Sequence, residues 1–108
     1  MKHISYCFSD ADIEVITFTL SILPDFDFGE SEVQAEINYQ CCLSAGSKLI
    51  ERSTDITPNE FRVILASLEA AQLITRGELD ADPETKKKCN SYLFTINKLV
   101  SVFDEQLS

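Results

Sequence analysis

The chain has 108 residues, of which 44% are apolar and only three each are Gly and Pro. This length suffices for one domain but not for two, and the composition excludes a mainly disordered or collagen-like protein. Asp and Glu outnumber Lys and Arg by 18 to nine, and the resulting net charge of −9 weighs against an extended nucleic-acid-binding surface.

The negative charge is concentrated in the N-terminal part of the chain. Residues 1–47 hold eight acids against Lys2, a net charge of −7, whereas ten acids and eight bases in residues 48–108 give −2. We therefore expect the first part to repel phosphate, while the second part can still carry a local basic patch.

The sequence predicts a cytoplasmic protein that does not act at a membrane. It has no apolar run of the roughly 18–20 residues that a membrane span needs, and its N-terminus does not resemble a secretory signal peptide. The cysteines lack paired spacing, so we expect all four to be reduced thiols: Cys7, Cys41, Cys42 and Cys89.

The first predicted helix has clear boundaries. Apolar residues alternate within residues 1–9, which indicates a short strand or a docked arm. Ser9 and Asp12 then form the pattern of a capping box, and helical spacing of apolar residues follows over residues 11–23. Pro24 ends this helix, because the residue before a proline is pushed away from helical geometry.

A loop and a second helix come next. Acidic and aromatic residues alternate in the loop of residues 24–30, and Ser31 with Gln34 marks the next helix start. Gly46 is expected to end that helix, because glycine is unfavourable inside a helix and favoured just past its end. A short third helix is then expected over residues 47–53.

The clearest boundary in the sequence lies at Thr57. Threonine is a good N-cap, Pro58 suits the first helical position, and Glu60 completes a capping box. These residues predict a helix over residues 58–71.

The C-terminal third of the sequence has two interpretations. Residues 73–79 and 91–96 are rich in β-branched and aromatic residues, which predicts two strands around the polar segment 80–90. Apolar residues also recur at helical spacing from residue 82 to residue 107, which predicts a helix instead.

Residues 47–96 together resemble a winged helix-turn-helix domain. Asp55-Ile56-Thr57 looks like the turn of the motif, and the stretch from Leu68 to Ile74 is similar to the common LEEAGLI tail, with Gln72 in place of glycine. The resemblance implies a single, mainly α domain with a small β-hairpin. It would comprise an acidic helical part (1–46), the winged part (47–96, with residues 80–90 as the wing tip) and a closing helix (97–108). The alternative fold is an all-α antiparallel helix bundle.

The winged-helix resemblance implies one possible function, a dimeric DNA-binding transcriptional regulator. The second helix of the motif enters the major groove of DNA, and cations hold the phosphates. Glu60 on that helix would oppose phosphate. The candidate DNA-binding residues are Thr57, Asn59 and Arg62 on the helix and Lys86, Lys87 and Lys88 at the wing tip.

The acidic and aromatic loop favours a different function, protein binding. Aromatic rings supply buried anchors at interfaces, and acids steer a basic partner. In size and charge the chain resembles small bacterial toxin-immunity proteins, which implies an inhibitor that covers a basic nucleic-acid-binding or nuclease site. A structural subunit is a third possibility, if Phe26, Phe28 and Tyr39 form one exposed patch. The candidate partner-binding residues are Asp25, Phe26, Asp27, Phe28, Glu30, Glu32 and Glu36.

The sequence offers little catalytic or metal-binding chemistry. His3 is the only histidine, and no Gly-rich phosphate loop or nucleophile motif is present. Cys41 and Cys42 are too few ligands for zinc, and the acidic run over residues 78–84 lacks the glycine and final glutamate of a calcium-binding EF-hand. We therefore predict no enzymatic activity, no cofactor and no metal.

Overall fold

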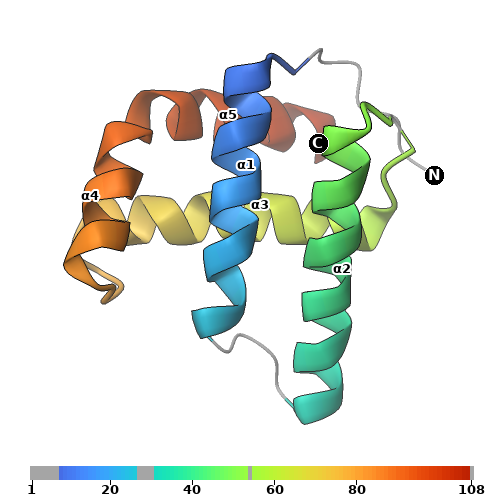
Figure 1. The fold of residues 1–108 in the computed structure, drawn as a ribbon, viewed down its shortest axis with the longest axis horizontal. Coiled ribbons are helices and arrows are strands. Elements are labelled where there is room, and N and C mark those ends of the chain that lie inside the picture. The colour runs from blue at the N-terminus through green and yellow to red at the C-terminus, as the bar shows by residue number, and fades with distance from the viewer. Residues whose placement is uncertain (1–7, 27–30, 54, 108) are drawn as a thin grey trace.

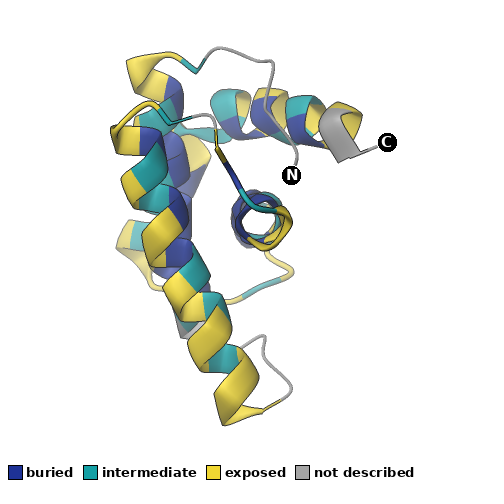
Figure 2. Cartoon of the chain, turned by 90° about the vertical axis from the view of Figure 1, so that its right-hand side faces the viewer, coloured by how far each residue is buried: buried dark blue, intermediate teal, exposed yellow. Residues whose placement is uncertain are grey.

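The computed structural model describes residues 8–26, 31–53 and 55–107, without the side chains of residues 25, 26, 106 and 107, and every element in this part is helical. Helices α1 and α2 run antiparallel to each other and lie across α3, while α5 runs back over α3 at an angle to it (Figure 1 and Figure 2). In chain order the elements are α1 (Asp10–Ile22), the 3₁₀ helix η1 (Leu23–Phe26), α2 (Glu32–Ile50), α3 (Pro58–Thr75), α4 (Pro83–Ser91) and α5 (Leu93–Leu107).

The predicted β-hairpin is wrong, since no strand occurs in the described part of the chain. The first expected strand, residues 73–79, begins as the last turn of α3, and most of the second, residues 91–96, is the first turn of α5. Ile96, Leu99 and Phe103 recur at helical spacing and are fully buried, so this buried stripe outweighs the β-propensity of the run. The all-α alternative describes the fold.

The expected wing tip, residues 80–90, is mostly helix α4. Asp82 is the N-cap of α4, and its carboxylate accepts two hydrogen bonds from Thr85 at 2.8 and 3.0 Å. The competing prediction of helix from residue 82 to 107 is correct except for one break at Tyr92, which separates α4 from α5.

The helix starts predicted from capping residues are confirmed. Ser9 and Thr57 each form a capping box with the acid three residues later, Asp12 and Glu60 respectively. The Ser31 hydroxyl accepts a hydrogen bond from a backbone N–H of the first turn of α2 at 3.1 Å. These contacts are local in sequence, so the sequence pattern locates them within a residue of the observed starts.

The predicted end of the second helix at Gly46 is wrong, because α2 continues to Ile50 and includes residues 47–50 of the separate third helix expected over residues 47–53. The extra turn buries Leu49 and brings Lys48 to Glu60, which offsets the helical cost of a glycine. The left-handed position after α2 is occupied by Arg52 (φ 64°), whose guanidinium donates to the Phe8 carbonyl at 2.7 Å.

Two glycines, one inside a helix and one just past a helix end, are expected to respond in opposite ways to replacement by alanine. Gly46 lies inside α2, and an added Cβ would meet only Leu20, at 4.0 Å, so Gly46→Ala should raise the free energy of unfolding by about 0.5–1 kcal/mol. Gly77 follows α3 with φ 76°, which strains any side chain, so Gly77→Ala should lower it by about 1 kcal/mol. Urea unfolding followed by circular dichroism measures both changes, and equal signs would contradict this explanation.

The buried apolar side chains form one cluster between the helices. Phe61 of α3 and Phe103 of α5 meet edge to face with ring centroids 4.9 Å apart, and Phe8 stacks on Phe103 at 5.7 Å. Helix α2 contributes little to this core. Its buried residues are Cys42, Ala45 and Leu49.

Candidate functional site

Helix α2 is the least covered of the long helices. The N-terminal half of α2 extends beyond α3, and almost all of its residues are exposed (Figure 2). Among the described residues, five of the six exposed large apolar side chains belong to α2, and Val33 is 71% exposed. The five are Val33, Ile37, Tyr39, Leu43 and Ile50. This concentration on one helix makes α2 the candidate interaction surface.

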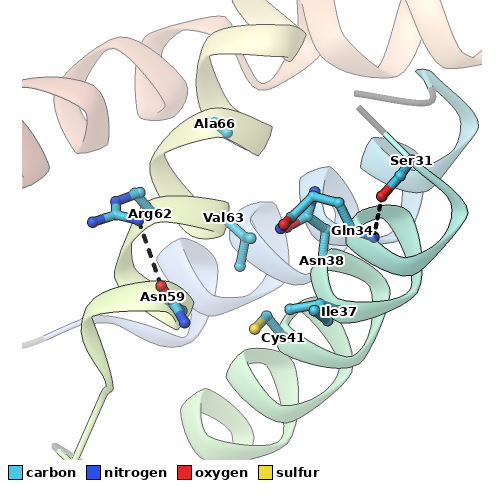
Figure 3. A pocket seen from close by; sticks show the side chains of 9 residues that line it. All are labelled: Ser31, Gln34, Ile37, Asn38, Cys41, Asn59, Arg62, Val63 and Ala66. Atoms are coloured by element: carbon cyan, nitrogen blue, oxygen red, sulfur yellow. Dashed lines mark hydrogen bonds between the residues drawn. The ribbon is translucent and has the colours of Figure 1, made fainter. Parts of the chain in front are cut away.

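One flank of α2 forms a groove with α3, which we call the α2–α3 groove (Figure 3). Its volume is about 470 Å³. Ile37 and Val63 contribute apolar surface, and Arg62 is the one charged residue among the described residues that line it. Its lining consists of Ser31, Gln34, Ile37, Asn38, Cys41, Asn59, Arg62, Val63 and Ala66.

The polar side chains of the α2–α3 groove form few strong hydrogen bonds with one another. The Gln34 amide donates to Asn38 at 3.0 Å, whereas Arg62 donates to Asn59 at 3.5 Å, a long and weak hydrogen bond. The guanidinium therefore keeps free donors. These amides and the cation suit a polar or anionic group and disfavour a cationic one.

The opposite flank of α2 forms a second groove, with α1, which we call the α1–α2 groove. Its volume is about 370 Å³, and no charged residue lines it among the described residues. Gly46 forms a gap between Leu43 and Ile50 on its α2 wall. Its lining consists of Thr17, Leu20, Ser21, Pro24, Tyr39, Cys42, Leu43, Gly46, Ser47 and Ile50.

Exposed acids lie near the ends of the α1–α2 groove. Glu32 and Glu36 are in the first turns of α2, and Glu14 is on α1. None of the three forms an ion pair with another described residue, and Glu36 accepts only a hydrogen bond from the Gln40 amide, at 2.9 Å. The apolar groove therefore has an acidic border.

The structure locates part of the predicted partner-binding set. Glu32 and Glu36 are exposed on α2. Asp27, Phe28 and Glu30 lie outside the described residues, as do the side chains of Asp25 and Phe26, whose backbone belongs to η1.

Sequence reasoning considered Tyr39 only together with Phe26 and Phe28, and missed that Leu43 and Ile50 continue an apolar row from Tyr39 beside these acids. The spacing of four and seven residues was a signal for it, because such residues share one helix face.

The predicted DNA-binding residues do not form one surface. Asn59 and Arg62 line the α2–α3 groove, and Thr57 caps the same end of α3. Lys86, Lys87 and Lys88 are exposed on α4 at the opposite end of α3, about 20 Å away along the helix (Figure 1). The Lys88 ammonium lies over the Phe18 ring at 5.0 Å. The DNA-binding alternative also required a β-hairpin, which the described part of the chain lacks.

Glu60, expected from the sequence to oppose phosphate on the candidate DNA-reading face, is instead buried between α2 and α3. The carboxylate accepts from Ser44 at 2.5 Å, Lys48 at 2.7 Å and the Thr57 N–H at 2.9 Å. Burial opposes ionisation of Glu60, but these hydrogen bonds outweigh it and hold its pKa below the ordinary 4.5. Glu60 therefore stabilises the scaffold and does not belong to a binding surface.

The cysteines are buried or half-buried thiols. Cys41, Cys42 and Cys89 are free, and Cys7 lies outside the described residues. Burial, together with the neighbouring Cys41, raises the pKa of Cys42 to about 11, and burial also raises the pKa of Cys89. In the described part of the chain, no three His, Cys, Asp or Glu side chains gather to hold a metal ion.

None of the helices in residues 8–26, 31–53 and 55–107 is both long and apolar enough to cross a membrane. In comparisons with known proteins, no family model, no curated protein and no solved structure matches the chain.

Proposed function

We propose that this chain is an acidic protein-binding module whose α2 surface covers a basic site on a partner protein, as an inhibitor or immunity protein would. The observation that carries this proposal is the coincidence of exposed apolar and acidic side chains on α2. Helix α2 holds five of the six large exposed apolar residues described, and Glu32 and Glu36 stand beside them without cationic partners among the described residues.

The two kinds of side chain have different roles in the proposed complex. Carboxylates of Glu32 and Glu36 occupy positions that phosphates would take on a nucleic-acid-binding or nuclease site. Apolar side chains such as Val33 and Leu43 are removed from water in the interface, which supplies most of the affinity. The net charge of −9 accelerates encounter with a basic partner and repels free nucleic acid.

The test is affinity capture of partners by the tagged chain from nuclease-treated lysate of the cells that produce it. We expect retention of a basic protein, weakened about tenfold when salt rises from 0.05 to 0.5 M, because salt screens the charges. The variant Glu32→Lys/Glu36→Lys should lose this protein.

A matched control is Asp80→Lys/Asp104→Lys, which changes the net charge equally at exposed positions outside α2. It should retain the basic protein. If the two double variants lose the basic protein equally, net charge alone explains its retention, and a specific role for α2 is contradicted. Retention only in lysate without nuclease treatment would also contradict the proposal, because nucleic acid would then mediate it.

A further inference from the structure

We infer that the partner inserts an amphipathic α-helix, apolar along one face and basic at both ends of that face, into the α1–α2 groove. This inference rests on the proposed function and specifies the chemistry that the partner must have.

The face of α2 that forms and borders the groove has the residue spacing of a helix-packing seam. Exposed and half-buried residues recur on it at alternating steps of four and three, the heptad pattern with which one helix receives the side chains of another. At Gly46 this row has a gap, because a Cβ at that position would meet only Leu20, at 4.0 Å. A side chain of an incoming helix can enter there. The row is Glu32, Glu36, Tyr39, Leu43, Gly46 and Ile50.

The two α1 hydroxyls in the lining donate their protons to their own helix, so neither can donate to a backbone carbonyl of an incoming segment. Thr17 donates to the Glu14 carbonyl at 3.0 Å, and Ser21 donates to the Phe18 carbonyl at 2.6 Å. An extended segment would bury many backbone N–H and C=O groups against a lining with few polar partners, whereas a helix satisfies its own backbone. The groove therefore favours a helix.

Acids at both ends of the groove define where the basic residues of the incoming helix must lie. Because α1 and α2 are antiparallel, Glu14 borders one end and Glu36 borders the other. Leu20 of α1 lies beside Gly46 of α2, so the distances of the two acids from this point can be added. At a rise of 1.5 Å per residue, Glu14 and Glu36 are about 24 Å apart along the groove, which is the length of about 16 residues of helix. Arg52 lies just beyond Ile50, but its charge is compensated by an ion pair with Asp10, so it does not cancel the negative charge at this end of the groove.

Two alternative placements fit the charges less well. The α2–α3 groove is lined by the cation Arg62, which would repel a basic helix. A second copy of this chain, docked by its own α2, would bring Glu32 and Glu36 against the acids of the first copy. Like charges at an interface oppose association.

The probe for the test is a synthetic helical peptide of three heptads, about 21 residues. It has Lys at the first a and the last d position, Leu at the a and d positions between them, and Ala or Gln elsewhere. In one control peptide Glu replaces every Lys, and in the other Ser replaces every Leu. Fluorescence anisotropy with the full chain should show that the Leu/Lys peptide binds at least about tenfold more tightly than either control. Equal binding of the Leu/Lys and Ser/Lys peptides would overturn the inference, because charge alone would then explain the binding.

Variants locate the peptide on the surface. Leu43→Ser, and Gly46→Leu, which fills the gap, should each weaken binding about tenfold. Phe94→Ser, which removes an exposed apolar residue of α5 that is 84% exposed, and Ile37→Ser in the α2–α3 groove should leave it unchanged. Because Leu43 is half-exposed, its variant should fold, and circular dichroism checks this.

The outcomes separate this inference from the proposed function. If Ile37→Ser loses the peptide and Leu43→Ser retains it, the groove assignment is wrong while α2 remains the binding helix. If no peptide binds but the wild-type chain still captures a basic protein that requires Glu32 and Glu36, the helical partner is wrong and the proposed function stands. If capture fails as well, both are wrong.

Discussion

Replacing Glu60 with alanine is expected to lower the free energy of unfolding by about 3 kcal/mol, measured by urea unfolding at neutral pH. The carboxylate is 4% exposed and is the common acceptor for Ser44, Lys48 and the first turn of α3. Its removal leaves a half-buried lysine without its acid and α3 without its capping box. The Glu60 carboxylate therefore links α2, the proposed binding helix, to the start of α3 through hydrogen bonds.

A control and a double-mutant cycle isolate that contact. Glu69→Ala removes an exposed acid of the same helix and should change stability by less than about 0.5 kcal/mol. Combined with Lys48→Met, the Glu60→Ala variant should show a coupling energy of at least about 1 kcal/mol. Additive losses from the two substitutions would contradict the pairing of Lys48 with Glu60.

Acid should destabilise the protein through two buried carboxylates. Asp12 repeats the arrangement of Glu60, since it closes the capping box of α1 and accepts from Lys98 of α5 at 2.8 Å. Burial opposes the ionisation of Asp12, but hydrogen bonds from Lys98 and Ser9 outweigh it and hold its pKa below the ordinary 3.8. Acids with a lowered folded pKa stabilise the fold above their unfolded pKa, and this contribution is lost as pH falls through the folded value.

The variant Asp12→Asn/Glu60→Gln tests this pH dependence. At pH 7 it should be less stable than the wild type by about 3–5 kcal/mol, because two charge-assisted contacts are lost. Between about pH 5 and pH 3 its stability should fall less than that of the wild type. Urea unfolding at several pH values measures both effects, and parallel pH curves for the two proteins would show that other groups carry the acid sensitivity.

Local signals in the sequence located the helix starts, and long-range packing accounts for what they missed. Ser9, Ser31 and Thr57 cap their helices through contacts three residues away, which any sequence reader can anticipate. Gly46 is also a local stop signal, but contacts of the following turn with α3 override it. The β-rich run of residues 91–96 is likewise mostly helical, with a break at Tyr92, because Ile96 begins the buried stripe that α5 contributes to the core.

The candidate site was only partly predictable for the same reason. Glu32 and Glu36 follow from the charge distribution of the sequence and lie exposed on α2 as expected. The α1–α2 groove, in contrast, depends on Leu20 of one helix meeting Gly46 of another, 26 positions apart in the sequence. Neither helix has a groove by itself, so no pattern within either one indicates it.

The most direct test of α2 as the binding surface is hydrogen–deuterium exchange of the full chain with and without the Leu/Lys peptide. Binding should slow exchange in α2 and in the C-terminal half of α1, and leave α4 and α5 unchanged, because α4 and α5 do not border the groove. Slower exchange confined to α4 or α5, or no change anywhere under conditions where anisotropy reports binding, would contradict the assignment of α2 as the surface that meets the partner.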